Sequence, residues 1–373
     1  MNKNKKYFSQ SKKSSYFCLR IAFIMTVTGS ERCYYLDLAK VFTAFLVVFG
    51  HLFSPDSQVR LYLYSFHMPL FFLISGIFHK YSGKINWDRY ARTILWPILI
   101  FIILESIVGA LFYGENIIEV LRKFFVNVSL GSYKGVLWFL FALFWCKVYQ
   151  DFFCGFRNKV IPVIIWGCLL FVPLYLFGRR LPFSLSQGLM GFPFYAIGFL
   201  GKDYLLTRRE SFRWGLPFVL LLVLNVLIVR YLQGRVSMVG TSFGNLGETL
   251  FGDAVNGFPV IFRGLVRLSN YFLFYLNGLI GSAMILSLSL LPFQKTRWIT
   301  SLSMSLITVL GTQYLFINVI EKTLGFDNSL LISTGLSIGI LFLCYLMHLI
   351  LKPAYDIAKP RPTTHGSQEN KPQ

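Results

Sequence analysis

The chain has 373 residues, of which 55% are hydrophobic and 14% are charged, and its mean hydropathy is +0.59. Soluble proteins carry about 25% charged residues, so this composition excludes a soluble globular protein and favours a helical membrane protein. The formal net charge of +20 would suggest nucleic acid in a soluble chain. Here the basic residues lie in short segments between apolar runs, where they set topology and meet anionic membrane lipids. Nucleic acid is therefore not expected as a partner.

Apolar runs long enough to cross a bilayer, which takes about 20 helical residues, recur along the whole chain. They occupy residues 34–54, 61–79, 93–113, 135–154, 160–178, 181–201, 214–232, 270–291, 298–320 and 329–351. The sequence thus predicts an all-α, polytopic membrane domain over residues 31–352 with about ten transmembrane helices. The distribution of Lys and Arg between alternate loops favours two cytoplasmic termini in the inner, cytoplasmic membrane.

Both ends of the chain differ from this apolar domain. Residues 1–30 are basic and are expected to form a disordered tail, although a translation start at Met25 would leave only a short lead-in to the first span. Residues 353–373 are polar and contain proline, so a disordered cytoplasmic tail is expected there. The six cysteines include no CxxC pair, so neither a disulfide framework nor a metal site is predicted.

The first apolar run carries three ionisable residues, Asp37, Lys40 and His51. Each is a candidate for function, because an ionisable group inside a bilayer costs several kcal/mol. From Lys40 to His51 a helix turns three times plus roughly 20° and rises about 16 Å. The two side chains therefore share a face and can line one path, but they cannot touch. Asp37 lies on the same face and is expected to pair with Lys40 or with a basic loop.

Further histidines lie in the apolar runs. His67 lies two residues before Pro69 in the second run. The short connection makes the first two spans antiparallel neighbours, which puts His51 and His67 at similar depth. A lone histidine on an apolar helix is often a satisfied core residue, but two on adjacent helices favour a site. His79 ends the second run and is expected at the interface, whereas His348 in the last run is expected to pack.

Arg89 and Arg92 lie just before the third run, at the start of the third predicted helix, and Glu105 lies deeper in that helix. Paired guanidinium groups suit phosphates, although a cytoplasmic anchor that sets topology explains the two arginines as well. Glu105 needs a partner or water, and Lys40 or a histidine are the partners that we expect.

Four segments of the chain resemble the acyltransferase 3 family of integral membrane proteins. The resemblance is specific over about residues 34–145. They are Asp37 and Lys40 followed by GHLF, FHMPLFFLISGIF at 66–78, Arg89-x-x-Arg92 followed by Pro97, and LWFL at 137–140. The resemblance implies a ten-helix O-acetyltransferase without a bound cofactor. Such an enzyme moves an acyl group, usually acetyl from cytoplasmic acetyl-CoA, onto a hydroxyl of a surface polysaccharide or lipid-linked sugar of the cell envelope.

Roles for individual residues also follow from the resemblance. His51 is implied to be catalytic, with Lys40 as its basic partner and His67 as a second site residue. The implied contacts to the substrate or donor are Arg89 and Arg92, which would meet the phosphates, and Asp37, Glu105 and Trp138. One departure concerns the ninth helix, where many relatives carry a histidine and this chain has Thr312 and Gln313.

The chemistry of a histidine agrees with this interpretation. A sugar hydroxyl attacks a thioester poorly unless a base removes its proton, and histidine exchanges protons near neutral pH. His51 is either that base or a transient carrier of the acyl group. The alternative is a transporter or flippase of lipid-linked glycans, which needs no acetyl-CoA, and a third possibility is a non-catalytic scaffold. The outer loop 233–269 is the region expected to recognise the acceptor.

Overall fold

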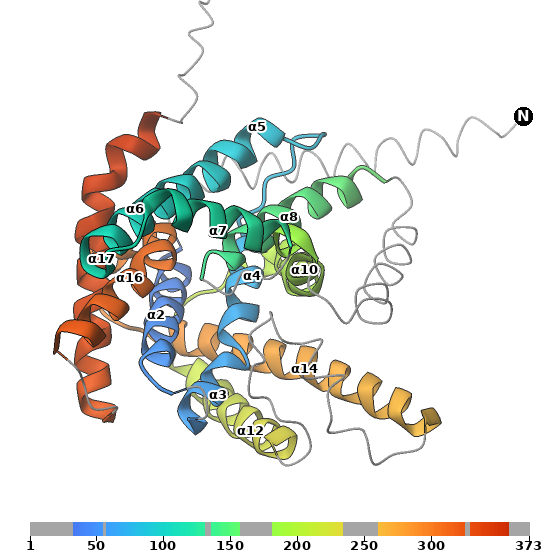
Figure 1. The fold of residues 1–373 in the computed structure, drawn as a ribbon. Coiled ribbons are helices and arrows are strands. Elements are labelled where there is room, and N and C mark those ends of the chain that lie inside the picture. Colours follow the sequence, from blue (N-terminus) through green and yellow to red (C-terminus); the bar gives the residue numbers. More distant parts are fainter. Residues whose placement is uncertain are drawn as a thin grey trace, which may run out of the picture. The chain divides into compact units, whose positions relative to one another are not determined.

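The computed structural model describes residues 33–54, 57–130, 136–156, 181–233, 260–324 and 329–357. The chain divides into two compact units, Met1–Tyr34 and Tyr35–Gln373, and only Cys33 and Tyr34 of the first are described. The described residues form helices and no strand, which confirms the predicted all-α class (Figure 1). The expected basic tail with Met25 lies outside the described residues, as does most of the outer loop 233–269.

Each predicted apolar run contains helix except run 160–178, which lies outside the described residues, and Ile117–Ser129 and Lys202–Leu206 are further helices between runs. The elements are α2 (Tyr34–His51), α3 (Gln58–Tyr64), α4 (His67–Ile77), α5 (Trp87–Tyr90), the π-helical turn η1 (Ala91–Leu95), α6 (Trp96–Tyr113), α7 (Ile117–Ser129), α8 (Trp138–Cys154), the 3₁₀ turn η3 (Pro182–Ser184), α10 (Leu185–Leu200), α11 (Lys202–Leu206), the 3₁₀ turn η4 (Phe212–Trp214), α12 (Gly215–Gln233), α14 (Val260–Ser289), α15 (Arg297–Met304), α16 (Leu306–Leu324) and α17 (Leu330–Ile357). The last helix continues through Pro353, so helix extends into the segment expected to be a disordered tail.

Five helical segments of the described residues are long and apolar enough to cross a membrane. They are Tyr34–His51, Trp87–Tyr113, Pro182–Leu200, Phe212–Tyr231 and Leu330–Asp356. A sixth span results if Arg297–Met304 and Leu306–Thr323, which are bent by 77°, are counted as one. The predicted count of about ten is not confirmed, because α8 has only 17 residues, Leu273–Ser289 is similarly short, and run 61–79 is divided between α3 and α4.

The break in run 61–79 has a cause in the sequence. Pro69 has no N–H to donate to the carbonyl of Ser65, and in a continuous helix its ring would clash with that carbonyl. The backbone leaves the helical region at Phe66, with φ −141° and ψ −20°, and the Ser65 hydroxyl donates to the carbonyl of Tyr62 at 2.7 Å. The predicted single helix was therefore wrong, and His67 begins α4 instead of lying in the middle of a span.

Helix α4 packs against α10, and α10 against α8, around a buried core (Figure 1). The approach of α4 to α10 depends on two glycines. A Cβ atom on Gly76 would lie 1.9 Å from the carbonyl oxygen of Tyr195, and one on Gly198 would lie 2.0 Å from that of Leu73. Small residues at such points let two membrane helices bring their backbones into contact.

Candidate active site

His51 is the last residue of α2, and aromatic side chains from α3 and α16 surround its ring. The hydroxyl of Tyr64 lies 2.8 Å from Nδ1 of His51, and the ring of Tyr314 packs edge-on with centroids 5.3 Å apart. The Tyr64 ring also meets the ring of His67 at 4.8 Å. Tyr64 thus connects the two predicted histidines. Sequence reasoning missed it, although its position three residues before His67 was a signal for a shared site.

His67 has a defined hydrogen-bonding state in this arrangement. Its Nδ1 lies 2.7 Å from the carbonyl oxygen of Leu63, so Nδ1–H donates there and Nε2 of the neutral ring carries no proton. Next to the histidines lies Arg60, which the sequence reasoning also missed. Its guanidinium donates to the carbonyl of Phe53 at 2.9 Å and lies 4.9 Å from the centroid of the Tyr64 ring. The site around His51 therefore includes a fixed positive charge.

Lys40 and Asp37 lie near the other end of α2. Lys40 Nζ lies 3.3 Å from Asp37 Oδ1, which confirms the predicted pairing. The hydroxyl of Ser303 donates to the same carboxylate oxygen at 2.6 Å, and the Lys40 ammonium lies 4.2 Å from the centroid of the Phe78 ring. Lys40 is thus held by this pair, about 16 Å of helix rise away from His51.

A cavity of about 740 Å³ contains both predicted arginines, and we name it the arginine cavity. It is lined by Asn86, Asp88, Arg89, Arg92, Thr93, Pro97, Ser301, Met304, Ile307, Tyr345, His348, Leu349, Lys352, Tyr355 and Asp356. Arg92 donates through Nε to Asp88 at 2.8 Å, which leaves its two terminal nitrogens for other partners. Lys352 adds a third basic side chain. Its spacing of four residues from His348 was a signal for a common helix face.

His348 is a polar residue of this cavity, whereas the sequence suggested a packing role. Its Nδ1 lies 3.0 Å from the hydroxyl oxygen of Thr308, which also lies 3.2 Å from the hydroxyl of Tyr355. The difference arises because α16 presents a hydroxyl to α17 at this level, a contact between segments far apart in the chain. The three side chains connect these two helices, and His348 and Tyr355 line the arginine cavity.

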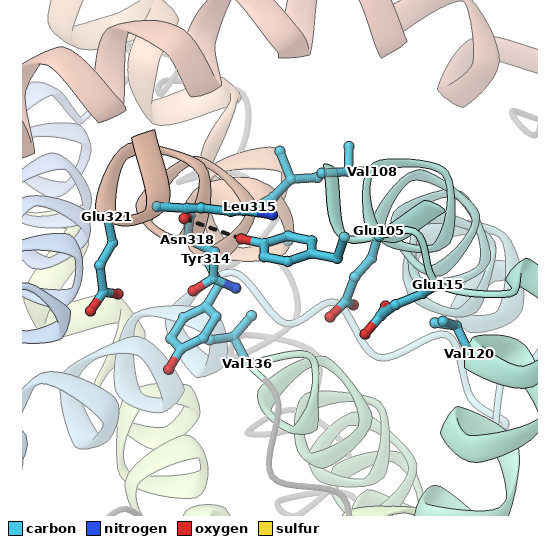
Figure 2. Close-up of a pocket in the computed structure, with 13 residues that line it drawn as sticks. Glu105, Val108, Glu115, Val120, Val136, Tyr314, Leu315, Asn318 and Glu321 are labelled. Carbon is cyan, nitrogen blue, oxygen red and sulfur yellow. Dashed lines mark hydrogen bonds between the residues drawn. The ribbon is translucent and has the colours of Figure 1, made fainter. Parts of the chain in front are cut away.

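A second cavity of about 490 Å³ lies beside the His51 site, since Tyr314 both lines it and packs on His51. We name it the glutamate cavity. Its lining residues are Glu105, Val108, Gly109, Tyr113, Glu115, Val120, Val136, Gly311, Tyr314, Leu315, Asn318, Glu321 and Lys322. Figure 2 shows the carboxylates of Glu105 and Glu115 close together. Lys322 donates to the carbonyl of Phe112 and lies 4.1 Å from the centroid of the Tyr113 ring.

Glu105 lies in this cavity without the partner predicted for it. Among the described residues, no hydrogen bond or ion pair joins it to Lys40 or to a histidine. Lys40 lies near the start of α2 and pairs with Asp37, whereas Glu105 lies in the second half of α6. The Glu105 carboxylate lines the glutamate cavity, which gives it the polar environment that the sequence analysis required.

The two cavities share helices α6 and α16. The arginine cavity takes Pro97 and Ile307 from the starts of these helices, and the glutamate cavity takes residues further along them, from Glu105 on in α6 and from Gly311 on in α16. Phe101 lies between the two sets, is 2% exposed, and packs on Gly311, where a Cβ atom would come within 2.3 Å of its ring. Its ring also meets that of Tyr355 with centroids 6.4 Å apart. A buried aromatic ring thus separates the cavities.

Three further positions from the sequence comparison have defined places. Trp138 is the first residue of α8 and follows Val136, which lines the glutamate cavity, by two residues. Thr312 and Gln313, which were expected to replace a ninth-helix histidine, are 0% and 1% exposed, and Oε1 of Gln313 accepts no hydrogen bond from the described residues. Its amide therefore occupies a buried position next to Tyr314 in the chain.

The fold and the site define a helical membrane protein with two separate polar cavities that are both lined by residues of α6 and α16, and with a histidine beside one of them. The family model described as an acyltransferase domain matches residues 34–349. The chain therefore belongs to the acyltransferase 3 family and is an acyltransferase by family. The match begins at the first residue of α2 and ends within α17, so it includes most residues of both cavities. No curated protein and no solved structure matches the chain.

Proposed function

We propose that the protein transfers an acyl group, most simply acetyl, from acyl-CoA in the arginine cavity to a hydroxyl of a surface polysaccharide or lipid-linked saccharide in the glutamate cavity. The observation that carries this proposal is the arrangement of the two cavities on α6 and α16, with His51 beside one and Arg89 and Arg92 in the other. The enzyme acts in the inner membrane with both termini and the arginine cavity on the cytoplasmic side.

The arginine cavity has the chemistry that a nucleotide donor requires. Arg89, Arg92 and Lys352 supply three cations for the phosphates of coenzyme A, and a guanidinium can contact two phosphate oxygens at once. Arg92 keeps its terminal nitrogens for this contact while Nε holds Asp88. The volume of about 740 Å³ lies within the range of small-molecule sites. The acyl arm would then extend past Phe101 toward His51.

The reaction follows from the geometry around His51. When its Nδ1–H donates to the Tyr64 oxygen, Nε2 is free to remove the proton of the acceptor hydroxyl. The oxygen forms a bond to the thioester carbonyl carbon, the C–S bond breaks, and the thiolate of coenzyme A leaves and takes up a proton. Glu105, Asn318 and Glu321 line the space that the acceptor would occupy, and their oxygens can accept hydrogen bonds from sugar hydroxyls.

The test is transfer of labelled acetyl from acetyl-CoA to cell-envelope glycan by membranes that contain the protein. We expect His51→Ala to reduce transfer by at least 100-fold, since a positioned acid–base group contributes about 10²–10⁴-fold. The amount of protein in the membrane should stay the same. Normal acetylation by His51→Ala would refute the assignment of His51. A wild-type protein that moves lipid-linked glycan without consuming acetyl-CoA would instead support a flippase.

A further inference from the structure

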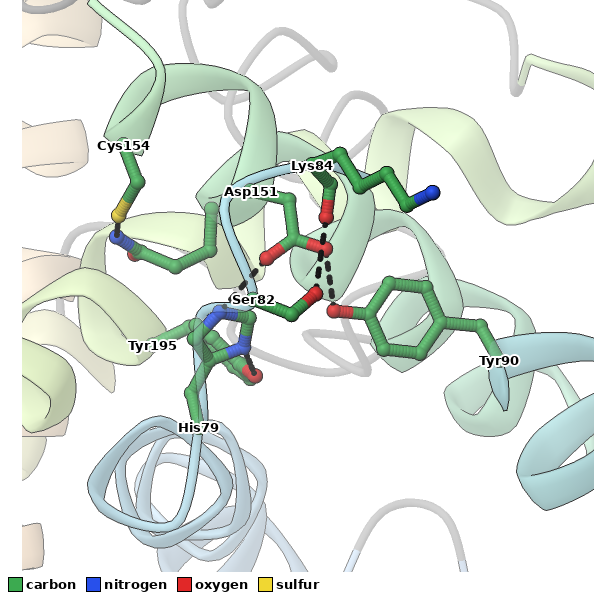
Figure 3. A network of polar contacts seen from close by, with 8 residues as sticks. His79, Ser82, Lys84, Tyr90, Asp151, Cys154 and Tyr195 are labelled. Carbon is green, nitrogen blue, oxygen red and sulfur yellow. Dashed lines mark hydrogen bonds and ion pairs between the residues drawn. The ribbon is translucent and has the colours of Figure 1, made fainter. Parts of the chain in front are cut away.

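Four buried side chains form a continuous hydrogen-bonded network that belongs to neither cavity (Figure 3). The hydroxyl of Tyr195 on α10 lies 2.8 Å from Nδ1 of His79, which follows α4. Nε2 of His79 lies 3.1 Å from Oδ1 of Asp151 on α8. The hydroxyl of Tyr90 on α5 donates to the other carboxylate oxygen of Asp151 at 2.5 Å. The network therefore joins four segments through side chains alone.

Burial shows that this network is structural and does not react with substrate. His79 is 3% exposed and Asp151 2%, so both side chains are enclosed by protein, although His79 follows the end of α4 as the sequence predicted. Both ring nitrogens and both carboxylate oxygens already have partners. A buried carboxylate is tolerated only when such hydrogen bonds replace water, and removing one partner leaves a strongly destabilised group. The four groups thus fix one another and leave no free atom for an acyl group or a sugar.

The end of the network at Tyr90 connects it to the arginine cavity. Tyr90 directly follows Arg89 and precedes the π-helical turn Ala91–Leu95, which carries Arg92. π-helical turns are rare and frequently occur at functional sites, and this one needs contacts that maintain it. Tyr90 is 4% exposed and binds Asp151, whereas both arginines line the cavity. The hydrogen bond therefore fixes the rotation of the segment from which both arginines project.

We propose that Tyr90, Asp151 and His79 are positioning residues that hold Arg89 and Arg92 in the geometry that binds the phosphates of the donor. This inference rests on the proposed function, because it assumes that the arginine cavity takes a coenzyme A thioester. Tyr90 lies between the two arginines in the chain, and its hydrogen bond to Asp151 holds this segment against α8. His79, which is itself hydrogen-bonded to Tyr195, orients the Asp151 carboxylate. If one of these hydrogen bonds is removed, both guanidinium groups remain but no longer point toward the donor phosphates. The affinity for the donor therefore falls, whereas the acceptor site is unchanged.

The experiment measures binding of coenzyme A to the purified full-length protein, together with KM and kcat for acetyl-CoA in transfer to cell-envelope glycan. The variants are Tyr90→Phe, which removes one hydroxyl, and Asp151→Asn, which removes the charge. Tyr149→Phe is the matched control, because Tyr149 also lies on α8 and its buried hydroxyl has no hydrogen-bond partner among the described residues. His79→Gln, which keeps an N–H donor toward Asp151, is compared with His79→Leu.

We expect Tyr90→Phe and Asp151→Asn to raise the Kd for coenzyme A and the KM for acetyl-CoA about tenfold, the lower end of the effect of supporting hydrogen bonds. kcat should change less than twofold, Tyr149→Phe should equal wild type, and His79→Gln should retain more affinity than His79→Leu. If Arg92→Gln weakens binding but folded Tyr90→Phe does not, the positioning role is overturned and the proposed function stands. A wild-type protein that binds no coenzyme A overturns both. If Asp151→Asn fails to fold, the Kd and KM of the milder variant Tyr90→Phe decide whether the network positions the arginines.

Discussion

At the residue scale, the hydrogen bond between Tyr64 and His51 is the contact that defines the base. A hydroxyl at 2.8 Å from Nδ1 orients the imidazole, and in the tautomer whose Nδ1–H donates to this hydroxyl, Nε2 accepts a proton. We predict that Tyr64→Phe lowers kcat for acetyl transfer about tenfold, less than His51→Ala, because the base remains but its orientation is lost. Binding of coenzyme A should not change, since Tyr64 lies outside the arginine cavity. A Tyr64→Phe variant with wild-type kcat would contradict this role.

A second prediction at this scale concerns Lys352, the basic residue that α17 adds to the arginine cavity. Lys352→Gln should raise the Kd for coenzyme A about fivefold, because a charge-assisted contact to phosphate contributes roughly 1–2 kcal/mol more than a neutral one. The effect should shrink in high salt, which screens the charge. Lys295→Gln serves as the control, since Lys295 is 65% exposed and pairs with Glu210. Equal affinities of the two variants would exclude Lys352 from the donor site.

At the scale of elements, the contact between α4 and α10 depends on backbone approach. Alanine at Gly198 would place its Cβ atom 2.0 Å from a carbonyl oxygen, a clash that only separation of the helices relieves. We predict that Gly198→Ala lowers the free energy of unfolding by about 3 kcal/mol or more, measured as thermal stability in detergent. Gly339→Ala on α17, where nothing lies within 4 Å, should be neutral or stabilising by up to about 1 kcal/mol. Equal stability of the two variants would contradict this packing.

At the scale of the whole molecule, the proposed reaction requires the two cavities to open on opposite sides of the membrane. The exposed Lys84, in the segment between α4 and α5, should face the cytoplasm, and the exposed Arg122 on α7 should face outward. In a background without the six native cysteines, a membrane-impermeant maleimide should label Arg122→Cys in intact spheroplasts. Lys84→Cys should react only after permeabilisation. The reverse pattern would place the arginine cavity outside and remove cytoplasmic acyl-CoA as donor.

The sequence by itself determined the properties that depend on local composition. Apolar runs predicted where helices lie, because backbone N–H and C=O groups inside a membrane find no water and must form hydrogen bonds within their own segment. Ionisable residues within those runs identified His51 and His67 as candidates, because burial of such groups is costly, and the spacing of Arg89 and Arg92 identified a pair suited to phosphates. The Asp37–Lys40 pair was predictable too, since three residues bring two side chains together on one helix.

Only the tertiary structure decided the contacts between distant segments. His79 meets Asp151 across 72 residues and Tyr195 across 116, and no local pattern encodes such a pairing. Lys352 and Glu105 likewise acquired their surroundings from the packing of α17 and α6 against α16. Hydropathy reports how each segment partitions between water and lipid, but the partners of its polar groups depend on which helices pack together. That packing brought the residues of each cavity together and linked Tyr90 to the arginines beside it.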